Sequence, residues 1–155
     1  MADLKPLSAF LETLPRVQLG FFPTPAHQMP RLGGQLAAET GRDVELWIKR
    51  DDQSGLAAGG NKVRKLEFLL ADAIAKGHRC VVTGGGFQSN SVRQSAAAAA
   101  KLGLECVLGL HEGYLRTEEF SSGGNVVLDE LLGAEIRVYP GRSSVECIAI
   151  AAAEL

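Results

Sequence analysis

The chain has 155 residues, 46% of them hydrophobic, and a formal net charge of −2. That length suffices for one domain with a hydrophobic core, and the nearly balanced charge argues against nucleic acid or an acidic membrane surface as a partner. No apolar run is long enough to cross a bilayer, and the N-terminus lacks a signal-peptide apolar region. Cys80, Cys106 and Cys147 fit neither a zinc site nor a disulfide framework, so we expect reduced cysteines in a cytoplasmic protein.

Residues 1–43 are predicted to form an N-terminal arm with one weak helix. Five of the six prolines lie within the first thirty residues, which should therefore be irregular. The residue before a proline is pushed out of the helical region, so 21–25 is expected to be extended. A weak helix is predicted over 31–40, interrupted by Gly33 and Gly34.

From residue 44 onward, short apolar stretches alternate with stretches of helical periodicity. The pattern predicts strands over 44–49, 80–83, 104–110 and 135–139, and helices over 61–76, 88–102, 124–132 and 143–155. This alternation is typical of βαβ units on an open parallel sheet with helices on both faces. We therefore predict that residues 44–155 form a small α/β domain.

The C-terminal end is unusual for a complete α/β unit. The last helix should begin at a Ser143 cap, and it ends on apolar residues without a capping glycine, a basic last turn or a following proline. We expect the chain to be a fragment or a truncated gene product whose last helix leaves an exposed apolar patch.

Lys62 stands at the start of a predicted helix, and Arg64 and Lys65 share its first turn. A helix N-terminus carries partial positive charge, so three cations there are unfavourable unless an anion, such as a phosphate, lies in front of it. A lysine held in this place also loses its proton more easily, as a nucleophilic amine requires. Leu66 and Leu69 are expected to continue this face inward, which would direct both amines toward the protein. The alternative is a solvated surface lysine.

Neighbouring charges are expected to form ion pairs. Arg64 should point elsewhere and could pair with Glu67. Asp51 and Asp52 follow two basic residues, a pattern that favours a solvated ion-pair patch over a metal site.

A second motif runs from a strand end through glycines into a helix: Thr83-Gly84-Gly85-Gly86-Phe87-Gln88-Ser89-Asn90. Open parallel sheets bind ligands at this end of their strands. Gln88, Ser89 and Asn90 could surround an anion there, within reach of the space in front of Lys62. Alternatively, the glycines only allow a tight turn and Ser89 or Asn90 is an N-cap. Ser89 replaces the third glycine of a dinucleotide fingerprint, which argues against that ligand.

Five ordered segments between residues 22 and 138 carry a family resemblance: 47–52, 55–57, 59–69, 88–94 and 124–129. They closely resemble the D-cysteine desulfhydrase and 1-aminocyclopropane-1-carboxylate deaminase family. These are pyridoxal-phosphate enzymes of the tryptophan synthase β-like fold, and the resemblance implies that this chain is part of such a fold. In that family the N-terminal arm belongs with the larger domain.

The resemblance implies a cofactor site for pyridoxal 5'-phosphate. Lys62 matches the lysine that forms the Schiff base with the cofactor. Asn61 and Lys65 match residues close to the cofactor phosphate, and Asn90 is implied to hold the ring oxygen.

Substrate-binding positions are implied in the same way. Gln88 and Asn90 match residues that hold the substrate carboxylate and the cofactor ring. Ser89 matches an active-site serine that is called the nucleophile in the deaminases. Ser91 stands where desulfhydrases usually have His and deaminases usually have Gln, which leaves the substrate open.

Family members are much longer than this chain. The half that is missing here is implied to carry the glycine-rich phosphate loop, the partner of the pyridine nitrogen and the active-site tyrosines. We therefore expect the 155-residue chain to bind the cofactor weakly or not at all.

The implied reaction is α,β-elimination from a small amino acid, with D-cysteine giving pyruvate, ammonia and sulfide. Deamination of the cyclopropane substrate, with Ser89 assisting ring opening, is the alternative. A full-length form is implied to be a homodimer. From other classes, the chain could be a catalytically silent domain or interaction module, or a hydrolase that pairs Ser89 with Lys62.

Overall fold

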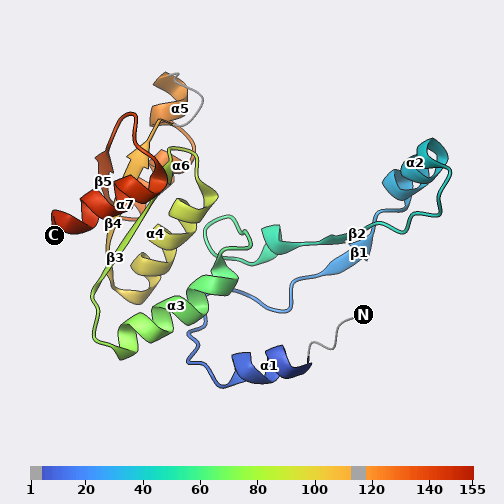
Figure 1. Ribbon diagram of the computed structural model, residues 1–155, viewed down its shortest axis with the longest axis horizontal. Helices are drawn as coiled ribbons and strands as arrows, with labels where there is room; N and C mark the ends of the chain where they lie inside the picture. Colours follow the sequence, from blue (N-terminus) through green and yellow to red (C-terminus); the bar gives the residue numbers. More distant parts are fainter. Residues whose placement is uncertain (1–4, 113–117) are drawn as a thin grey trace.

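The structure, a computed structural model, describes residues 5–112 and 118–155 (Figure 1). Its centre is a three-stranded parallel sheet in the order β3-β4-β5. The strands are β3 (Cys80–Gly86), β4 (Glu105–His111) and β5 (Glu135–Val138). The helices that connect and follow them are α4 (Asn90–Leu102), α5 (Glu118–Ser122), α6 (Asn125–Leu131) and α7 (Ser144–Ala153). The predicted open parallel α/β fold is confirmed.

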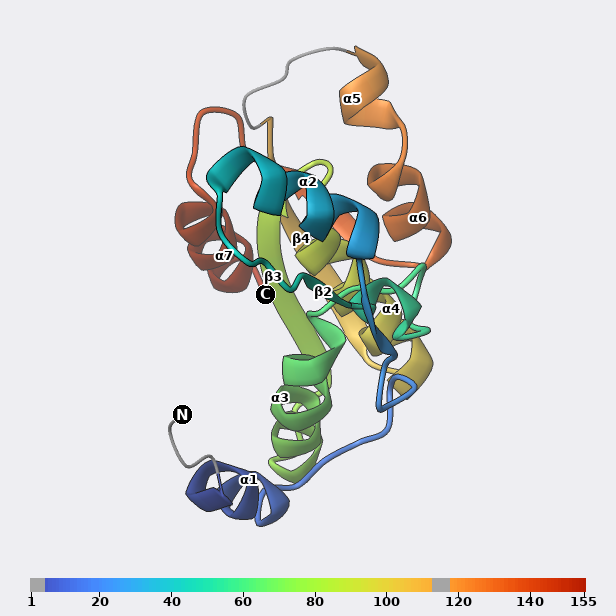
Figure 2. The ribbon, with the colours of Figure 1, turned by 90° about the vertical axis from the view of Figure 1, so that its right-hand side faces the viewer.

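Helices cover both faces of this sheet. Successive residues of a strand point to opposite faces, and two glycines of β3 identify the helix on each side. A Cβ on Gly84 would lie 3.0 Å from Ile148 Cγ1 of α7, whereas a Cβ on Gly85 would lie 3.1 Å from Val92 Cγ2 of α4. The sheet therefore lies between α7 and α4, as Figure 2 shows.

The glycines of β3 differ from the sequence prediction, which ended the strand at Thr83. Residues 84–86 continue the strand and pair with 109–111 of β4. A Cβ on Gly109 would lie 2.7 Å from the carbonyl oxygen of Cys147 in α7, and one on Gly84 would lie 2.5 Å from Gly109 O. The missing side chains thus allow α7 to pack directly on the strands, rather than allowing a turn.

The first strand lies outside the parallel sheet. β1 (Ala26–Gln28) pairs antiparallel with β2 (Trp47–Lys49), and α2 (Pro30–Thr40) connects them. This ribbon and α2 extend away from the α/β unit (Figure 1). The helix predicted over 31–40 is confirmed, whereas the strand predicted over 44–49 begins only at Trp47 and does not join the sheet. The domain boundary after residue 43 stays a prediction.

Two helices were not predicted: α5, in a segment predicted to be a loop, and α1 near the N-terminus. α1 (Lys5–Glu12) lies beside α3 (Val63–Ala75) in both views (Figures 1 and 2). The prediction of an irregular segment failed because Pro6 falls in the first turn of α1, where the missing N–H of proline costs no helical hydrogen bond.

The C-terminal helix has the predicted cap. Ser143 and Glu146 form a capping box, in which each side chain accepts a backbone N–H of the other residue. Cys147 and Ala151 of α7 are buried, whereas Val145 and Leu155 are exposed. All three cysteines are free thiols. In the described part of the chain, each helix is too short or too polar to cross a membrane.

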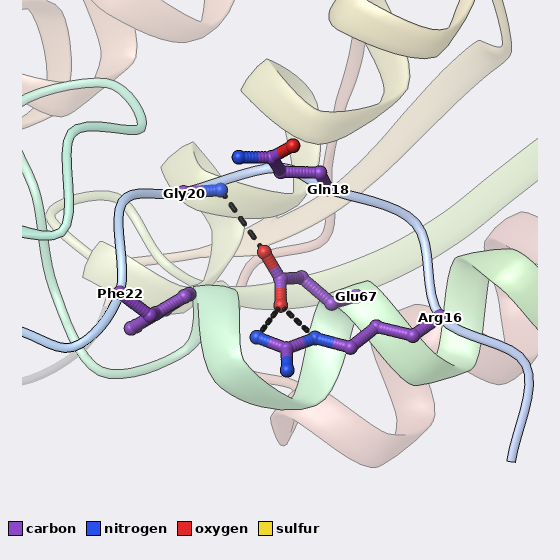
Figure 3. A pocket seen from close by; sticks show the side chains of 5 residues that line it. All are labelled: Arg16, Gln18, Gly20, Phe22 and Glu67. Atoms are coloured by element: carbon purple, nitrogen blue, oxygen red, sulfur yellow. Dashed lines mark hydrogen bonds and ion pairs between the residues drawn. The ribbon is translucent and has the colours of Figure 1, made fainter. Parts of the chain in front are cut away.

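Glu67 of α3 anchors the N-terminal arm (Figure 3). Its side chain is 1% exposed. The carboxylate accepts the N–H groups of Leu19 at 2.9 Å and Gly20 at 3.1 Å, and it pairs with the Arg16 guanidinium at 2.5 Å. Burial alone would raise the pKa of Glu67, but these donors outweigh it and hold the pKa below its ordinary value.

We predict that Glu67→Gln lowers the free energy of unfolding by about 2 kcal/mol at neutral pH, because it replaces a buried carboxylate that accepts two backbone N–H groups and pairs with the half-exposed Arg16. Urea unfolding measures the loss. Because the folded pKa of Glu67 is depressed, its contribution is fully present above the ordinary value of 4.5 and is lost as the pH falls through the folded pKa. The difference between variant and unmodified chain should therefore shrink in acid. Asp72→Asn, in the exposed Asp72–Lys76 pair, is the control and should cost less than about 1 kcal/mol. Equal losses in both variants would contradict the anchoring role.

Candidate functional site

A glycine loop, residues 55–60, leads into α3. Every residue of this loop except Leu56 has a positive φ, including Ala57 at 43° and Ala58 at 62°. Non-glycine residues rarely adopt this conformation, and such strain clusters at ligand sites. The fully buried Ser54 holds the loop, since its Oγ donates to Gly60 O at 2.9 Å and accepts the Gly60 N–H at 3.0 Å.

Two of the three cations at the start of α3 carry unbalanced charge. Arg64 pairs with Asp51 at 2.6 Å. Lys62 is the N-cap residue and half-buried, and its Nζ donates to Asn61 Oδ1 at 2.9 Å, whereas Lys65 is exposed. Within residues 5–112 and 118–155, neither Lys62 nor Lys65 pairs with a carboxylate. Two free positive charges at a helix N-terminus suit an anionic ligand.

The prediction that Leu66 and Leu69 both face the interior of the protein is partly wrong. Leu66 is buried, as expected, but Leu69 is 57% exposed and lies one turn after the exposed Lys65. The buried face consists instead of Val63, Leu66, Glu67 and Leu70. Lys65 therefore lies at the edge of the site and not inside the protein.

The ion pairs also differ from one expectation. Arg64 does not pair with Glu67 but with Asp51, and Thr24 Oγ1 donates to the same carboxylate at 2.7 Å. Hydrogen bonds from Arg64 and Thr24 hold the pKa of Asp51 well below its usual range. Asp52 pairs with Arg50 at 2.6 Å, so the interpretation of Asp51 and Asp52 as an ion-pair patch is confirmed.

Gln94 joins the start of α3 to the start of α4. Its side chain is fully buried; Oε1 accepts the N–H of Val63 at 3.1 Å, and Nε2 donates to Asn90 O at 3.1 Å. A Cβ on Gly60 would lie 2.1 Å from Gln94 Nε2, so only glycine fits at that position. The residue next to Lys62 is thereby tied to the first turn of α4.

The start of α4 carries the other predicted site residues. Ser89 is the N-cap, and its Oγ accepts the N–H of Val92 at 3.4 Å, so its capping role is present. Asn90 is exposed, and Ser91 is half-buried on the same turn. Lys62 Nζ is bonded to Asn61 and not to Ser89, which gives no support to a Ser–Lys hydrolase.

The side chain of Gln88 already forms hydrogen bonds within the chain. Its Nε2 donates to Phe120 O at 2.8 Å and Gly123 O at 2.7 Å, and its Oε1 accepts the N–H of Asn125 at 2.9 Å. A substrate carboxylate could reach the Gln88 amide only by replacing one of these bonds.

Arg93 connects three segments around this site. Its Nη2 donates to Gly59 O at 3.0 Å, and its Nη1 donates to Asn90 Oδ1 at 2.9 Å and Asn125 Oδ1 at 2.8 Å. The fully buried carboxylate of Asp129 is the acidic group whose charge acts on it. Burial raises the pKa of Asp129 to about 6, although the positive charge of Arg93 lowers it.

The network thus joins the start of α3 to the start of α4. The predicted site residues stand at these two places: Asn61, Lys62 and Lys65 around the start of α3, and Gln88, Ser89, Asn90 and Ser91 at the start of α4. The sequence reasoning missed Arg93, Gln94 and Asn125 as residues that connect them. Arg93 and Gln94 precede the buried alanine run of α4, and long polar side chains in such a place are the signal that could have indicated buried partners.

A hollow of about 330 Å³ lies elsewhere, lined by Arg16, Gln18, Gly20, Phe22 and Glu67 (Figure 3). The Glu67 carboxylate at its wall is already bonded to Leu19, Gly20 and Arg16. This hollow is therefore part of the arm's anchor rather than a second candidate site.

A parallel α/β unit with free cations and amide donors at two joined helix N-termini is an arrangement that suits a small anionic ligand. A family model described as "Pyridoxal-phosphate dependent enzyme" matches residues 17–155, and the chain belongs to this family. The resemblance seen in the sequence motifs is thus confirmed.

The chain is similar to two kinds of curated relatives. It is 47% identical over 129 residues to a D-cysteine desulfhydrase of Klebsiella pneumoniae, covering 83% of this chain and 38% of that protein. It is 46% identical over 131 residues to a 1-aminocyclopropane-1-carboxylate deaminase of Burkholderia orbicola, covering 83% and 37%. The chain therefore spans well under half the length of these relatives.

Solved structures agree with the fold. The crystal structure of an ACC deaminase homologue is similar to this chain, with a TM-score of 0.78 and 38% identity. The match covers 99% of this chain and 43% of the homologue's chain. Diaminopropionate ammonia lyase of Escherichia coli, at 19% identity and a TM-score of 0.52, covers 88% of this chain and 37% of its own, and supports the fold alone.

Proposed function

We propose that this chain supplies the lysine-bearing wall of the active site of a pyridoxal-phosphate-dependent lyase or deaminase that acts on a small amino acid. The observation that carries the proposal is the half-buried Lys62, free of any carboxylate partner among the described residues, at an α3 N-terminus that Gln94 ties to the start of α4. Family membership and the relatives' names support it.

The donors at this site fit the cofactor. Pyridoxal phosphate presents an aldehyde, a dianionic phosphate and a ring oxygen, and the site offers amines, amides and a hydroxyl. In this proposal Lys62 carries the cofactor, Asn61 and Lys65 lie beside its phosphate, and Asn90 donates to its ring oxygen. When bound, the cofactor supplies an electron sink for the charge left on the substrate Cα.

The substrate side is assigned to Ser89, Asn90 and Ser91, with Gln88 binding a carboxylate if it exchanges one of its present bonds. The Lys62 amine would move the Cα proton. We favour α,β-elimination from D-cysteine, because the motifs look more like the desulfhydrase branch. Deamination of 1-aminocyclopropane-1-carboxylate, with Ser89 assisting ring opening, is the second candidate, and the names of similar proteins favour it. A homodimer is proposed for a longer form.

Covalent labelling tests the role of Lys62. In a form of the protein as long as its relatives, borohydride reduction in the presence of pyridoxal phosphate should fix a pyridoxyl group on the peptide that carries Lys62, because that amine lies at the anion site. Peptide mass spectrometry locates the label, and Lys62→Ala is the control. Label on Lys49, Lys65 or Lys76 in the unmodified protein would sink the assignment.

The 155-residue chain by itself should bind the cofactor only weakly and release no measurable sulfide or ammonia. The physical reason is that a phosphate needs a full ring of donors, and this chain offers one wall of it. Assays with D-cysteine and with 1-aminocyclopropane-1-carboxylate check this. If the purified chain released sulfide at a rate typical of an enzyme, and Lys62→Ala abolished it, the half-site account would be wrong.

A further inference from the structure

The amide of Asn90 is held at its oxygen end. Asn90 Oδ1 accepts hydrogen bonds from Arg93 Nη1 at 2.9 Å and from Asn125 Nδ2 at 3.3 Å. A guanidinium group only donates hydrogen bonds, so this contact requires the oxygen, and not the nitrogen, to face Arg93. Within residues 5–112 and 118–155, Asn90 Nδ2 makes no hydrogen bond, and the residue is exposed.

Arg93 itself has little freedom to move. It is 8% exposed, and its second nitrogen, Nη2, donates to Gly59 O at 3.0 Å in the glycine loop. The buried Asp129 carboxylate lies close enough to act on its charge. A displaced Arg93 would leave a buried charge without its partners, which costs several kcal/mol.

Asn125 is oriented by the same rules. Its Oδ1 accepts from Arg93 Nη1 at 2.8 Å, and its Nδ2 donates to Gln88 O at 2.9 Å as well as to Asn90 Oδ1. Its backbone N–H is fixed by Gln88 Oε1. Reversing either asparagine amide would place two donors against each other at Arg93, so the network has one consistent arrangement of donors and acceptors.

We propose that Arg93 and Asn125 are positioning residues that turn the Asn90 amide so that its Nδ2 faces the ligand as a preoriented donor to the cofactor ring oxygen. This inference rests on the proposed function. Because the amide is set before the ligand arrives, binding orders no further side chain there. The site then favours ligands that present an acceptor at this position over ligands that lack one.

The first experiment needs no ligand. Nitrogen-15 relaxation of side-chain amides in the 155-residue chain should show the Asn90 amide to be ordered despite its exposure. In Arg93→Met it should become mobile, whereas the exposed Asn61 amide serves as the unchanged reference. An Asn90 amide that is equally mobile with and without Arg93 would overturn the proposal. Should Arg93→Met fail to fold, Arg93→Lys keeps the charge beside Asp129 but loses the fork that reaches both Gly59 and Asn90.

The second experiment compares pyridoxal phosphate with its 3-deoxy analogue, which lacks the ring oxygen. Dissociation constants come from NMR titration at millimolar ligand, a method that detects weak binding. The unmodified chain should prefer pyridoxal phosphate by roughly three- to tenfold, the contribution of one hydrogen bond. Asn90→Ala and the Arg93 variant should each bring this ratio to about one, and the double variant should change it no further.

The ratio separates the possible outcomes. If Arg93 only stabilised the fold, its loss would weaken both ligands equally and leave the preference unchanged, which would overturn the inference but not the proposed function. The inference would also be overturned if the unmodified chain bound pyridoxal phosphate and its 3-deoxy analogue equally well. If pyridoxal phosphate shifted no signal of the unmodified chain, the inference would be overturned. The proposed function would not be, because it is tested by the labelling of Lys62 in the longer form.

Discussion

Gln94 lies fully buried between α3 and α4, where it accepts the Val63 N–H and donates to the Asn90 carbonyl. The Val63 N–H belongs to the first turn of α3, whose donors have no partner within the helix. Leaving such a buried donor without a partner costs about 1–3 kcal/mol. The bridge requires a glycine at position 60, which in turn places Lys62 at the end of a strained loop. The position of Lys62, which we propose as the cofactor lysine, relative to the Ser89–Ser91 turn therefore depends on this amide, together with the bonds of Arg93 to Gly59 and Asn90.

Charge is distributed around this bridge in two ways. Arg64 forms an ion pair with Asp51, and Arg93 donates hydrogen bonds to Gly59, Asn90 and Asn125, so these cations stabilise the structure. Lys62 and Lys65 stay without a carboxylate partner in the described part of the chain, although they stand at the positive end of a helix. This contrast supports our proposal that an anionic ligand occupies the space in front of Lys62 and Lys65.

The sequence predicted what depends on neighbours along the chain. The helix α3, the Ser143 cap and the alternation of strands and helices follow from local periodicity and capping residues. The sequence predictions failed where contacts between distant parts of the chain determine the local structure. The sequence pattern predicted a turn at the glycines of β3. They continue the strand instead, because the close approach of α7 leaves no room for side chains there. The outward direction of Leu69 depends on which face of α3 meets Leu19 and α4.

The candidate site shows the same division. Lys62, Asn61, Ser89 and Asn90 stand in recognisable motifs at helix starts, where local reasoning is strong. The roles of Arg93 and Asn125 could not be predicted, because each depends on partners more than thirty residues away. That Gln88 is bonded to the segment at 120–125 also follows only from tertiary contacts.

Amide hydrogen exchange at Val63 tests the bridge most directly. First-turn amides normally exchange quickly because they lack a helical acceptor. With Gln94 in place, the Val63 amide should be strongly protected. The variant Gln94→Met keeps the length and apolar packing of the side chain but lacks the acceptor. In this variant the Val63 amide should exchange at the rate of an unprotected first-turn amide, while the amides at the centre of α3 stay protected. A Val63 amide that exchanges quickly in the unmodified chain, or one that stays protected in Gln94→Met, would contradict the account.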